Sequence, residues 1–312
     1  MSDRHAYLIM AHNNWNQLSV LLSLLDDIRN DIYLHIDKKS GAFPKEILCE
    51  KVKKSSLYFI PRKKVYWGDY SQVEVELALM EVSSSREHYR YYHLLSGLDL
   101  PLKSQEEIHA FFKNESHEFI PMIAEGVPEV EEFICYYHLP LLIRNQLYKN
   151  NRWIRGLDKG LVYIQRFLGL KRVYEKDLVI AKGWQWFSIT DDFCRYVLSQ
   201  KSLIRKLFSF TRCSDENVMG TMVNKLGNHD MVYHVAKIEE GENNLQSSCL
   251  RYIDFGRTGK RPYIWGRDDA DKDFEELMNS GMLFARKFDE NVNKEIIERV
   301  AVHILKGINP VI

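Results

Sequence analysis

Short apolar runs on either side of one helical stripe are the feature that most constrains the fold of this chain. Residues 6–11 (AYLIMA) and 32–36 (IYLHI) are apolar runs of strand length, and each ends in polar residues. Between them, apolar residues recur at helical spacing, at Leu18, Leu21, Leu22, Leu25 and Ile28. A strand, a helix and a strand in this order form a β-α-β unit with parallel strands and a right-handed crossover. The sequence therefore predicts an α/β protein.

Further elements follow from capping signals and apolar runs. Ser71 with Glu74 and Ser104 with Glu107 have the spacing of capping boxes, and the first predicts a helix to about residue 84. Thr190 is predicted to cap a helix to about residue 198, and residues 213–216 to open another. Additional strands are predicted at residues 91–95, 118–123, 182–189 and 250–254.

Three polar residues come directly or shortly after predicted strands. His12 follows residues 6–11, Asp37 follows residues 32–36, and Asp99 comes soon after residues 91–95. Parallel α/β sheets bind ligands beyond the carboxyl ends of their strands. We therefore expect these three side chains at a ligand-binding edge of the sheet.

The charge balance and the cysteines exclude some classes of protein. The 43 basic and 43 acidic side chains cancel, whereas a general nucleic-acid binder carries a net basic charge or a basic face. No apolar run approaches the roughly 18 residues of a membrane-spanning helix. The five cysteines are scattered and never form a C-x-x-C pair, so we expect reduced, buried thiols. These features predict a cytoplasmic protein.

Residues 144–176 form a strongly basic segment. The segment contains nine lysines and arginines but only two acids, Asp158 and Glu175, and aromatic residues occur between the basic positions. One interpretation is a solvated helical excursion. The others are a site for an anionic acceptor and a peripheral contact with the inner face of the cell membrane.

Eight short segments occur in an order that is specific as a set, although each is weak alone. They are residues 6–12, 33–37, 65–71, 92–101, 185–188, 214–216, 250–254 and 283–289. Together they resemble glycosyltransferase family 14, which contains the branching β-1,6-N-acetylglucosaminyltransferases and the peptide-O-xylosyltransferases. The animal members of this family carry membrane anchors and disulfides, neither of which is seen here, so the resemblance is to the shorter bacterial members.

The resemblance implies a GT-A-like α/β fold with a Rossmann-like nucleotide-binding half and a mixed central sheet. We expect one GT-A-like catalytic domain over residues 1–312. Its nucleotide-binding half would be about 1–125, its basic insertion about 144–176, and its acceptor-binding and catalytic half about 177–312.

The resemblance also implies a reaction. A sugar, N-acetylglucosamine or xylose, would pass with inversion from a UDP-sugar to a hydroxyl of a glycan acceptor, free or lipid-linked. Such a displacement needs a base for the acceptor proton and positive charge for the departing UDP. The UDP-sugar is a co-substrate, and no metal or other cofactor is expected, because the family looks metal-independent.

Glu216 is the predicted base, because the family carries its catalytic glutamate in the Ser-Asp-Glu context of residues 214–216. On local sequence alone, an acid in the first turn of a helix capped by Ser214 merely complements the helix dipole. Asp215 is the nearest rival, and its alternative role is local capping.

Arg286 and Lys287 are predicted to hold the diphosphate. In the family, the lysine of the Phe-Ala-x-Lys-Phe motif supplies the positive charge that a metal ion would otherwise supply. The alternative is a solvated basic pair, although Phe284 and Phe288 on either side would aim the cations inward. Arg261 matches a second diphosphate-binding arginine loosely.

The acids have several predicted roles. Asp99 would accept hydrogen bonds from donor-sugar hydroxyls or from a cation of the Arg286–Lys287 pair. Asp37 would bind ribose hydroxyls and His12 would flank the uracil. The literal Asp-x-Asp strings within residues 269–273 follow no predicted strand and are interpreted as a solvated loop.

The other donor or sugar contacts are expected from Trp67, Gly68, Trp184, Trp186 and Asp254.

Two other functions stay open. A nucleotidyltransferase shares the β-α-β start, but it would normally need a metal and a glycine-rich phosphate loop, and no such string occurs here. A sugar-binding protein that kept the fold and lost the chemistry is the non-enzymatic alternative.

Overall fold

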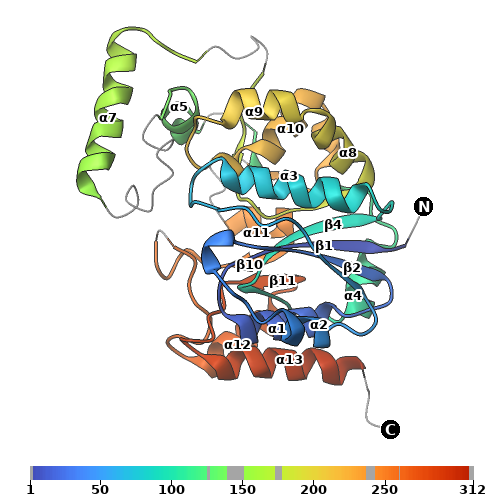
Figure 1. Cartoon of the computed structure of the whole chain (residues 1–312). Coiled ribbons are helices and arrows are strands. Elements are labelled where there is room, and N and C mark those ends of the chain that lie inside the picture. Colours follow the sequence, from blue (N-terminus) through green and yellow to red (C-terminus); the bar gives the residue numbers. More distant parts are fainter. Residues whose placement is uncertain are drawn as a thin grey trace.

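A five-stranded sheet in the order β3-β2-β1-β4-β8 organises the protein (Figure 1). The computed structural model describes residues 3–124, 127–138, 151–172, 178–236, 243–259 and 261–308. β1 (His5–Ala11) pairs in parallel with β2 (Asn30–Ile36) and β4 (Tyr91–Ser96). β3 (Ser56–Phe59) pairs in parallel with β2, while β8 (Ser188–Thr190) runs antiparallel to β4. The predicted β-α-β unit is present, with α1 (Trp15–Leu25) between β1 and β2.

Two three-stranded sheets complete the strand topology of the described residues. In the first, β11 (Phe284–Arg286) lies between β10 (Arg251–Ile253) and β5 (Asp99–Pro101). This sheet joins the last part of the chain to the segment directly after β4. In the second, β6 (Met122–Ile123) lies between β7 (Lys182–Gly183) and β9 (Val235–Ala236).

Helices cover both faces of the central sheet (Figure 1). On one face α3 packs against α8, and on the other α1 packs against α13, while α7 stands apart from both layers (Figure 1). The bounds of the remaining helices are α2 (Lys45–Glu50), α3 (Ser71–Ser84), α4 (Gln105–Phe112), α5 (Pro128–Ile134), α7 (Arg152–Phe167), α8 (Asp191–Ser199), α9 (Lys201–Phe208), α10 (Val218–Leu226), α11 (Asn243–Cys249), α12 (Ala270–Asn279) and α13 (Lys294–Ile308). Short 3-10 turns occur at Lys38–Ser40, Ser214–Glu216 and His229–Met231.

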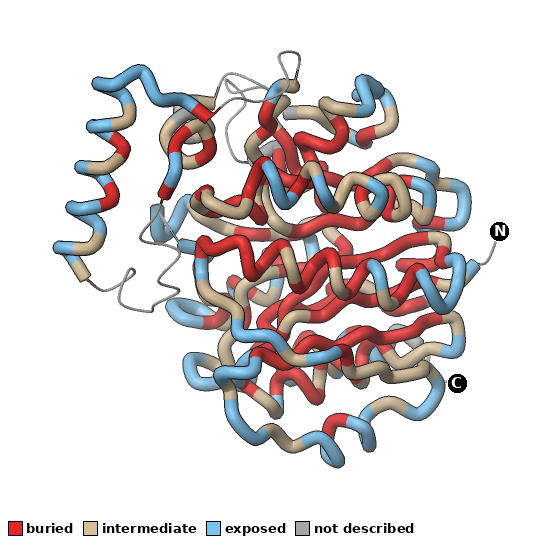
Figure 2. Tube along the Cα trace, turned by 45° about the horizontal axis from the view of Figure 1, so that its top comes forward, coloured by how far each residue is buried: buried red, intermediate tan, exposed pale blue. Residues whose placement is uncertain are grey.

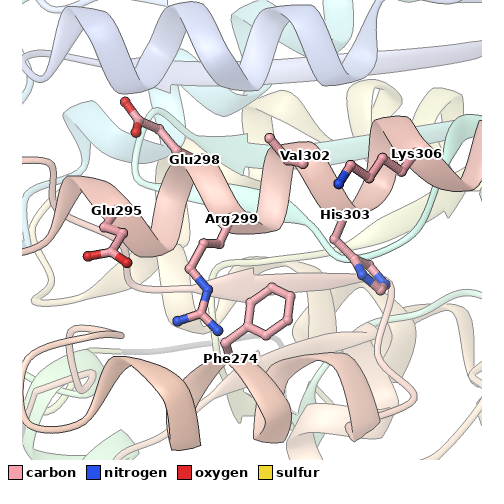
Figure 3. A pocket seen from close by; sticks show the side chains of 7 residues that line it. All are labelled: Phe274, Glu295, Glu298, Arg299, Val302, His303 and Lys306. Atoms are coloured by element: carbon pink, nitrogen blue, oxygen red, sulfur yellow. The ribbon is translucent and has the colours of Figure 1, made fainter.

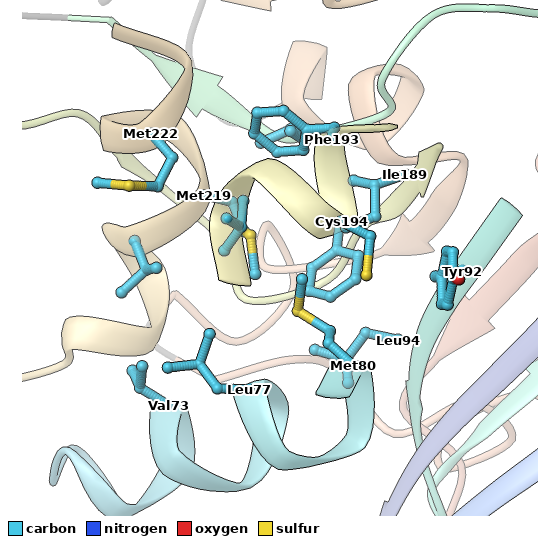
Figure 4. Close-up of a cluster of buried hydrophobic side chains, with 14 of the residues drawn as sticks. Val73, Leu77, Met80, Tyr92, Leu94, Ile189, Phe193, Cys194, Met219 and Met222 are labelled. Carbon is cyan, nitrogen blue, oxygen red and sulfur yellow. The ribbon is translucent and has the colours of Figure 1, made fainter. Parts of the chain in front are cut away.

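The central strands are apolar on both faces because each face meets a separate hydrophobic cluster. In β1, Ala6 and Leu8 join the cluster formed with α3, α8 and α10. Figure 4 shows labelled side chains of these three helices in that cluster. Tyr7 and Ile9 point the other way, into the cluster formed with α1 and α13. Figure 2 shows the resulting buried band through the middle of the molecule.

The helix predictions are confirmed in part. The capping box of Ser104 and Glu107 is confirmed at the start of α4, and Thr190 caps α8. The capping box at Ser71 is wrong: α3 has no side-chain cap at its N-terminus, and the Ser71 hydroxyl instead accepts a hydrogen bond from the Tyr66 backbone N–H at 3.0 Å. The stripe that predicted α1 ends at Leu25, and Ile28 lies beyond the helix with 76% of its surface exposed.

Two predicted strands are shorter in the structure. Residues 182–189 form β7 and β8 with a break between them, because the two ends pair with different sheets. Residues 118–123 form only β6, preceded by isolated bridges at Glu118 and Phe119.

The cysteines follow the expectation only in part. All five are free thiols; Cys194, Cys213 and Cys249 are buried, whereas Cys49 is exposed and Cys135 is intermediate. Among the described residues, no helix combines the length and the apolar character needed to cross a bilayer.

Candidate active site

The carboxyl ends of β1 and β2 bring His12 and Asp37 together. The Asp37 backbone N–H donates to the Ala11 carbonyl at 2.9 Å. The Asp37 carboxylate accepts from the Lys39 backbone N–H at 2.9 Å and lies 3.5 Å from the Lys39 ammonium. Desolvation lowers the pKa of His12, and the charge of Lys287 adds to this effect while that of Asp37 opposes it. His12 therefore lies within electrostatic reach of both the β2 end and the residue after β11.

Asp99 and Arg286 meet where β5 and β11 pair. They are direct partners in the antiparallel register, and the Arg286 guanidinium donates to the Asp99 carboxylate at 2.7 Å. Asp99 also accepts from the Ser96 backbone N–H at 2.7 Å, which ties it to the end of β4. The guanidinium carbon lies 4.4 Å from the centre of the Trp186 ring. A cation is thus held between a carboxylate and an aromatic face at the strand ends.

Lys287 is fixed through its backbone. Its carbonyl accepts from the Trp265 backbone N–H at 3.0 Å, and its own N–H donates to the Tyr263 carbonyl at 3.3 Å. Phe284 and Phe288 on either side of the cation pair are fully buried. The segment is therefore anchored as its sequence predicts.

The residues after Lys287 are tied to the start of α1. The Asn14 side chain donates to the Asp289 carboxylate at 2.9 Å. The Gln17 backbone N–H donates to the Glu290 carboxylate at 2.8 Å, and the Gln17 side chain accepts from the Glu290 backbone N–H at 3.1 Å. These bonds hold the end of β11 against the β1–α1 turn that carries His12.

Glu216 ends a 3-10 turn between α9 and α10. Its carboxylate contacts the Lys182 ammonium, and about a third of its side chain (35%) is exposed. Burial lowers the pKa of Lys182, but the charge and hydrogen bond of Glu216 outweigh burial and raise it overall. Ser214 does not cap the turn, which was wrongly predicted: its hydroxyl is buried without a hydrogen-bond partner among the described residues.

Two buried acids lie behind Glu216. Asp215 accepts from the Gln72 side chain at 2.9 Å, so it reaches α3 instead of capping its own turn. Burial, together with the charge of Glu216, raises the pKa of Asp215 to about 7. Glu76, one turn after Gln72, accepts from the Gln185 side chain at 2.7 Å, and burial raises its pKa well above the ordinary value. Asp215 and Glu76 therefore form a layer of buried acids on the protein side of the candidate base, Glu216.

The Trp67–Gly68 loop packs against the Glu216 turn. The Gly68 carbonyl accepts from the Cys213 backbone N–H at 3.0 Å, and its own N–H donates to the Gln72 side chain at 2.6 Å. Gly68 has a φ of 69°, and a Cβ there would touch the Cys213 sulfur at 3.4 Å. Both backbone groups of Gly68 are thus used within the protein, and the exposed member of the loop is Trp67 (61%).

Asp254 and Arg261 are less well connected to the other predicted residues. The Asp254 carboxylate pairs with Arg257 at 3.0 Å. Trp184 packs against Phe255 with ring centres 5.4 Å apart, which brings the β10 end toward the 182–188 segment. Arg261 is exposed, and no contact between its side chain and the β11 cations is seen in the described part of the chain.

The Asp-x-Asp strings do not form a loop, which corrects the sequence interpretation. Asp269 caps α12, and Asp271 pairs with Arg299 at 2.6 Å. Asp273 is buried and accepts from the Tyr263 hydroxyl at 2.9 Å and the Gly266 backbone N–H at 2.7 Å. Within the described ranges, no three His, Cys, Asp or Glu side chains are grouped so that they could hold a metal ion.

Lys182, Gln72 and Glu76 were not predicted from the sequence. Gln72 and Glu76 are spaced four residues apart on the inner face of α3, and this spacing of polar side chains on a buried face was the available signal. Lys182 has no comparable local signal, because its partner Glu216 is 34 residues away.

A pocket of about 370 Å³ lies between α12 and α13, apart from these residues (Figure 3). Its lining mixes both charges with apolar side chains, and it includes Arg299, Glu295, Glu298 and Lys306. It contains none of the predicted site residues.

The mixed sheet and the site at its strand ends define the class: this is a GT-A-like α/β glycosyltransferase fold. The model of one family, the Core-2/I-branching enzymes, matches residues 5–263, and the chain belongs to that family.

Individual relatives agree with the family at low identity. The chain is 23% identical to human xylosyltransferase 2 over 327 residues, which cover 98% of this chain and 34% of the relative. It is 22% identical to human xylosyltransferase 1 over 317 residues, covering 96% of this chain and 30% of the relative. The chain thus spans about a third of the length of these curated relatives. Mouse xyloside xylosyltransferase 1 in its apo form is a structural neighbour, with a TM-score of 0.32, 12% identity, and 78% and 94% of the two chains covered.

Proposed function

We propose that this chain is an inverting glycosyltransferase that moves a sugar from a UDP-sugar to a hydroxyl of a glycan acceptor. The observation that carries the proposal is that residues 182–188 contact both a candidate base and a candidate cation. Lys182 at one end contacts Glu216, and Trp186 near the other end lies over Arg286. A candidate base and a candidate cation thus flank one segment, an arrangement that suits an in-line displacement.

Glu216 is the proposed base. The acceptor oxygen forms its bond to the anomeric carbon while its proton passes to the Glu216 carboxylate. The bond between the anomeric carbon and the UDP oxygen breaks, and UDP leaves with the electron pair. Support comes from exposure: Glu216 is partly exposed, whereas Asp215 is buried and bound by Gln72.

Arg286 and Lys287 are proposed to meet the charge on the departing diphosphate, so that no metal is required. Arg286 is already held by Asp99 and Trp186, and a cation fixed before the reaction needs little reorganisation when negative charge develops. The backbone bonds of Lys287 to residues 263 and 265 give its position a similar rigidity.

The nucleotide is proposed to bind at the ends of β1 and β2, beside His12, Asp37 and Trp67. The names of the relatives support xylose as the transferred sugar, and the resemblance of the sequence to the branching enzymes supports N-acetylglucosamine as the alternative. Trp184, Trp186 and Asp254 are proposed as neighbours of the sugar, and the acceptor is proposed to be a glycan, free or lipid-linked.

The experiment is release of UDP by the purified protein from a series of UDP-sugars, with and without glycan acceptors. We expect acceptor-stimulated UDP release from UDP-N-acetylglucosamine or UDP-xylose, and a product with inverted anomeric configuration by NMR. A retained configuration would exclude the inverting mechanism.

The same assay separates the alternatives. A sugar-binding protein without activity would bind UDP in calorimetry but release none from any donor. A nucleotidyltransferase would instead release or consume pyrophosphate, and either result would overturn the proposal.

A further inference from the structure

Helix α7 carries three distinct rows of side chains. The row that faces the protein contains Asp158 and Val162, both buried. The Asp158 carboxylate lies 2.9 Å from His138 Nδ1, and the Gln165 side chain makes two hydrogen bonds with the Tyr137 backbone. This row fixes α7 against the segment that follows α5, and the rest of the helix surface is turned outward (Figure 2).

The second row is apolar and exposed. Trp153 is 84% exposed and Phe167 is 82% exposed, although each side chain is large and hydrophobic. The other exposed members are Leu157, Tyr163 and Ile164 in the helix, and Leu168 and Leu170 directly after it. Positions 153, 157 and 164 are separated by four or seven residues, so they share one face of the helix. Scattered exposed apolar residues are ordinary, but a continuous row of this kind marks an interaction surface.

The third row is basic and borders the apolar row. Arg152, Arg155, Lys159 and Arg166 are exposed and are spaced by three, four and seven residues. The sole acid of α7 is Asp158, which is buried against His138. The exposed surface of α7 therefore carries positive charge only.

Two other cations of the basic segment, Lys171 and Arg172, follow the end of α7. Arg172 is buried and donates to the Lys206 carbonyl at 2.9 Å. Arg144, Lys149 and Lys176 lie outside the described residues. Within the described residues, the exposed cations of α7 thus form one row beside the apolar row.

We propose that α7 docks on a membrane surface that contains anionic lipid. The apolar row would lie at the boundary between headgroups and acyl chains, and the basic row would contact the phosphates. A helix with an apolar face, a cationic face and too little length and hydrophobicity to span the bilayer lies in the interface plane. Trp153 near the start of the helix has the amphipathic ring that favours this depth.

The positive charge of α7 favours a lipid surface over a second copy of the chain as the binding partner. Two copies that packed their α7 helices together would bring two cationic rows close to each other, at a cost in repulsion. A bilayer with anionic headgroups offers apolar and negative regions at once, and so matches both rows. The proposal does not depend on the transferase activity.

The test is flotation of the whole protein with vesicles of phosphatidylcholine alone, or of phosphatidylcholine with phosphatidylglycerol, at low and high salt. We expect binding to the anionic vesicles at low salt and weaker binding at high salt or without the anionic lipid. The charge variant combines Arg152→Glu, Arg155→Glu and Lys159→Glu, and the apolar variant combines Trp153→Ala and Phe167→Ala. Each should reduce partitioning by about tenfold or more.

A matched control keeps the result specific to α7. Lys51→Glu, Lys53→Glu and Lys54→Glu make the same change in net charge at exposed positions after α2. This control should bind within about threefold of the unaltered protein, because distant charges are screened. All variants change exposed side chains, so their melting temperatures should match that of the original chain.

Three results would overturn the proposal. One is an unaltered protein that ignores anionic vesicles at low salt. Another is an apolar variant that binds as well as the original, since charge alone would then explain binding. The third is a self-association, seen by light scattering, that the apolar variant abolishes while vesicle binding is absent.

Discussion

Glu216 and Asp215 are adjacent acids in contrasting surroundings. Glu216 contacts Lys182 at the surface, whereas Asp215 is enclosed and accepts from Gln72. In the proposed reaction, the partly exposed carboxylate is open to an acceptor hydroxyl, whereas the buried one is not. This difference between neighbours makes the role of each acid separable by substitution.

Glu216→Gln should lower sugar transfer by on the order of 10²-fold or more, because the amide cannot accept the acceptor's proton. UDP binding and melting temperature should change little, since size and most hydrogen bonding are kept. Steady-state transfer and calorimetry with UDP check this. Glu81→Gln is the matched control, because Glu81 is an exposed glutamate paired with Lys201 at 2.8 Å. Normal turnover by Glu216→Gln would move the base elsewhere.

Lys287→Ala should weaken UDP binding and lower kcat together, the latter by on the order of 10²-fold, because the cation would serve both the bound donor and the leaving group. Transfer by the unaltered protein should persist in EDTA. Lys294→Ala, at an exposed lysine paired with Glu298, should leave both quantities near their original values. Activity that is lost in EDTA and restored by manganese would contradict the role given to Lys287.

Asp215 should make stability depend on pH. Its folded pKa of about 7 lies above the ordinary 3.8, so the folded state binds more protons than the unfolded state between these values. The stability it contributes is complete below pH 3.8 and is lost as pH rises through about 7. Asp215→Asn should therefore make the fall in unfolding free energy from pH 5 to pH 8 shallower, by up to about 1.4 kcal/mol per pH unit.

Urea unfolding at several pH values measures this slope. Some slope should persist in Asp215→Asn, because burial also raises the pKa of Glu118 to about 7. Parallel pH profiles for the variant and the original would show that Asp215 does not titrate in this range.

At the scale of elements, α4 is a helix whose start depends on one side chain. The Ser104 hydroxyl accepts from the Glu107 backbone N–H, and the Glu107 carboxylate accepts from the Ser104 backbone N–H. Ser104→Ala should lower the free energy of unfolding by about 1 kcal/mol, as measured by urea denaturation. Ser85→Ala removes an exposed hydroxyl after α3 and should cost clearly less. Equal decreases in the free energy of unfolding for the two variants would mean that the Ser104 cap contributes nothing specific to stability.

Elements with strong local periodicity could be predicted, and those defined by distant partners could not. The apolar runs of β1 and β2 located both strands within two residues of their ends. Residues 182–189 carry a strand-like run as well, but its two ends pair with β6 and β4, so the run breaks in the middle. Ser71 has the correct spacing for a cap, yet the loop just before it uses its hydroxyl, through the Tyr66 backbone N–H.

At the scale of the whole molecule, the candidate site joins segments that are remote in sequence. Strand order alone indicated that His12 and Asp37 would be neighbours, because parallel strands end at one edge. The pairing of Asp99 with Arg286 spans 187 positions, and it confirms one of the two roles predicted for Asp99. Lys182 escaped prediction because no local pattern links it to Glu216.

The late position of β11 has a consequence for synthesis on the ribosome. The N-terminal strands emerge first and begin to fold first. Arg286, however, follows Asp99 by 187 positions, and Asp289 follows Asn14 by 275 positions. A nascent chain that stalls before residue 283 therefore leaves β5 without its neighbouring strand and Asp99 without its counter-charge. The chain therefore has to be translated as far as residue 287 before the cationic end of the proposed site exists.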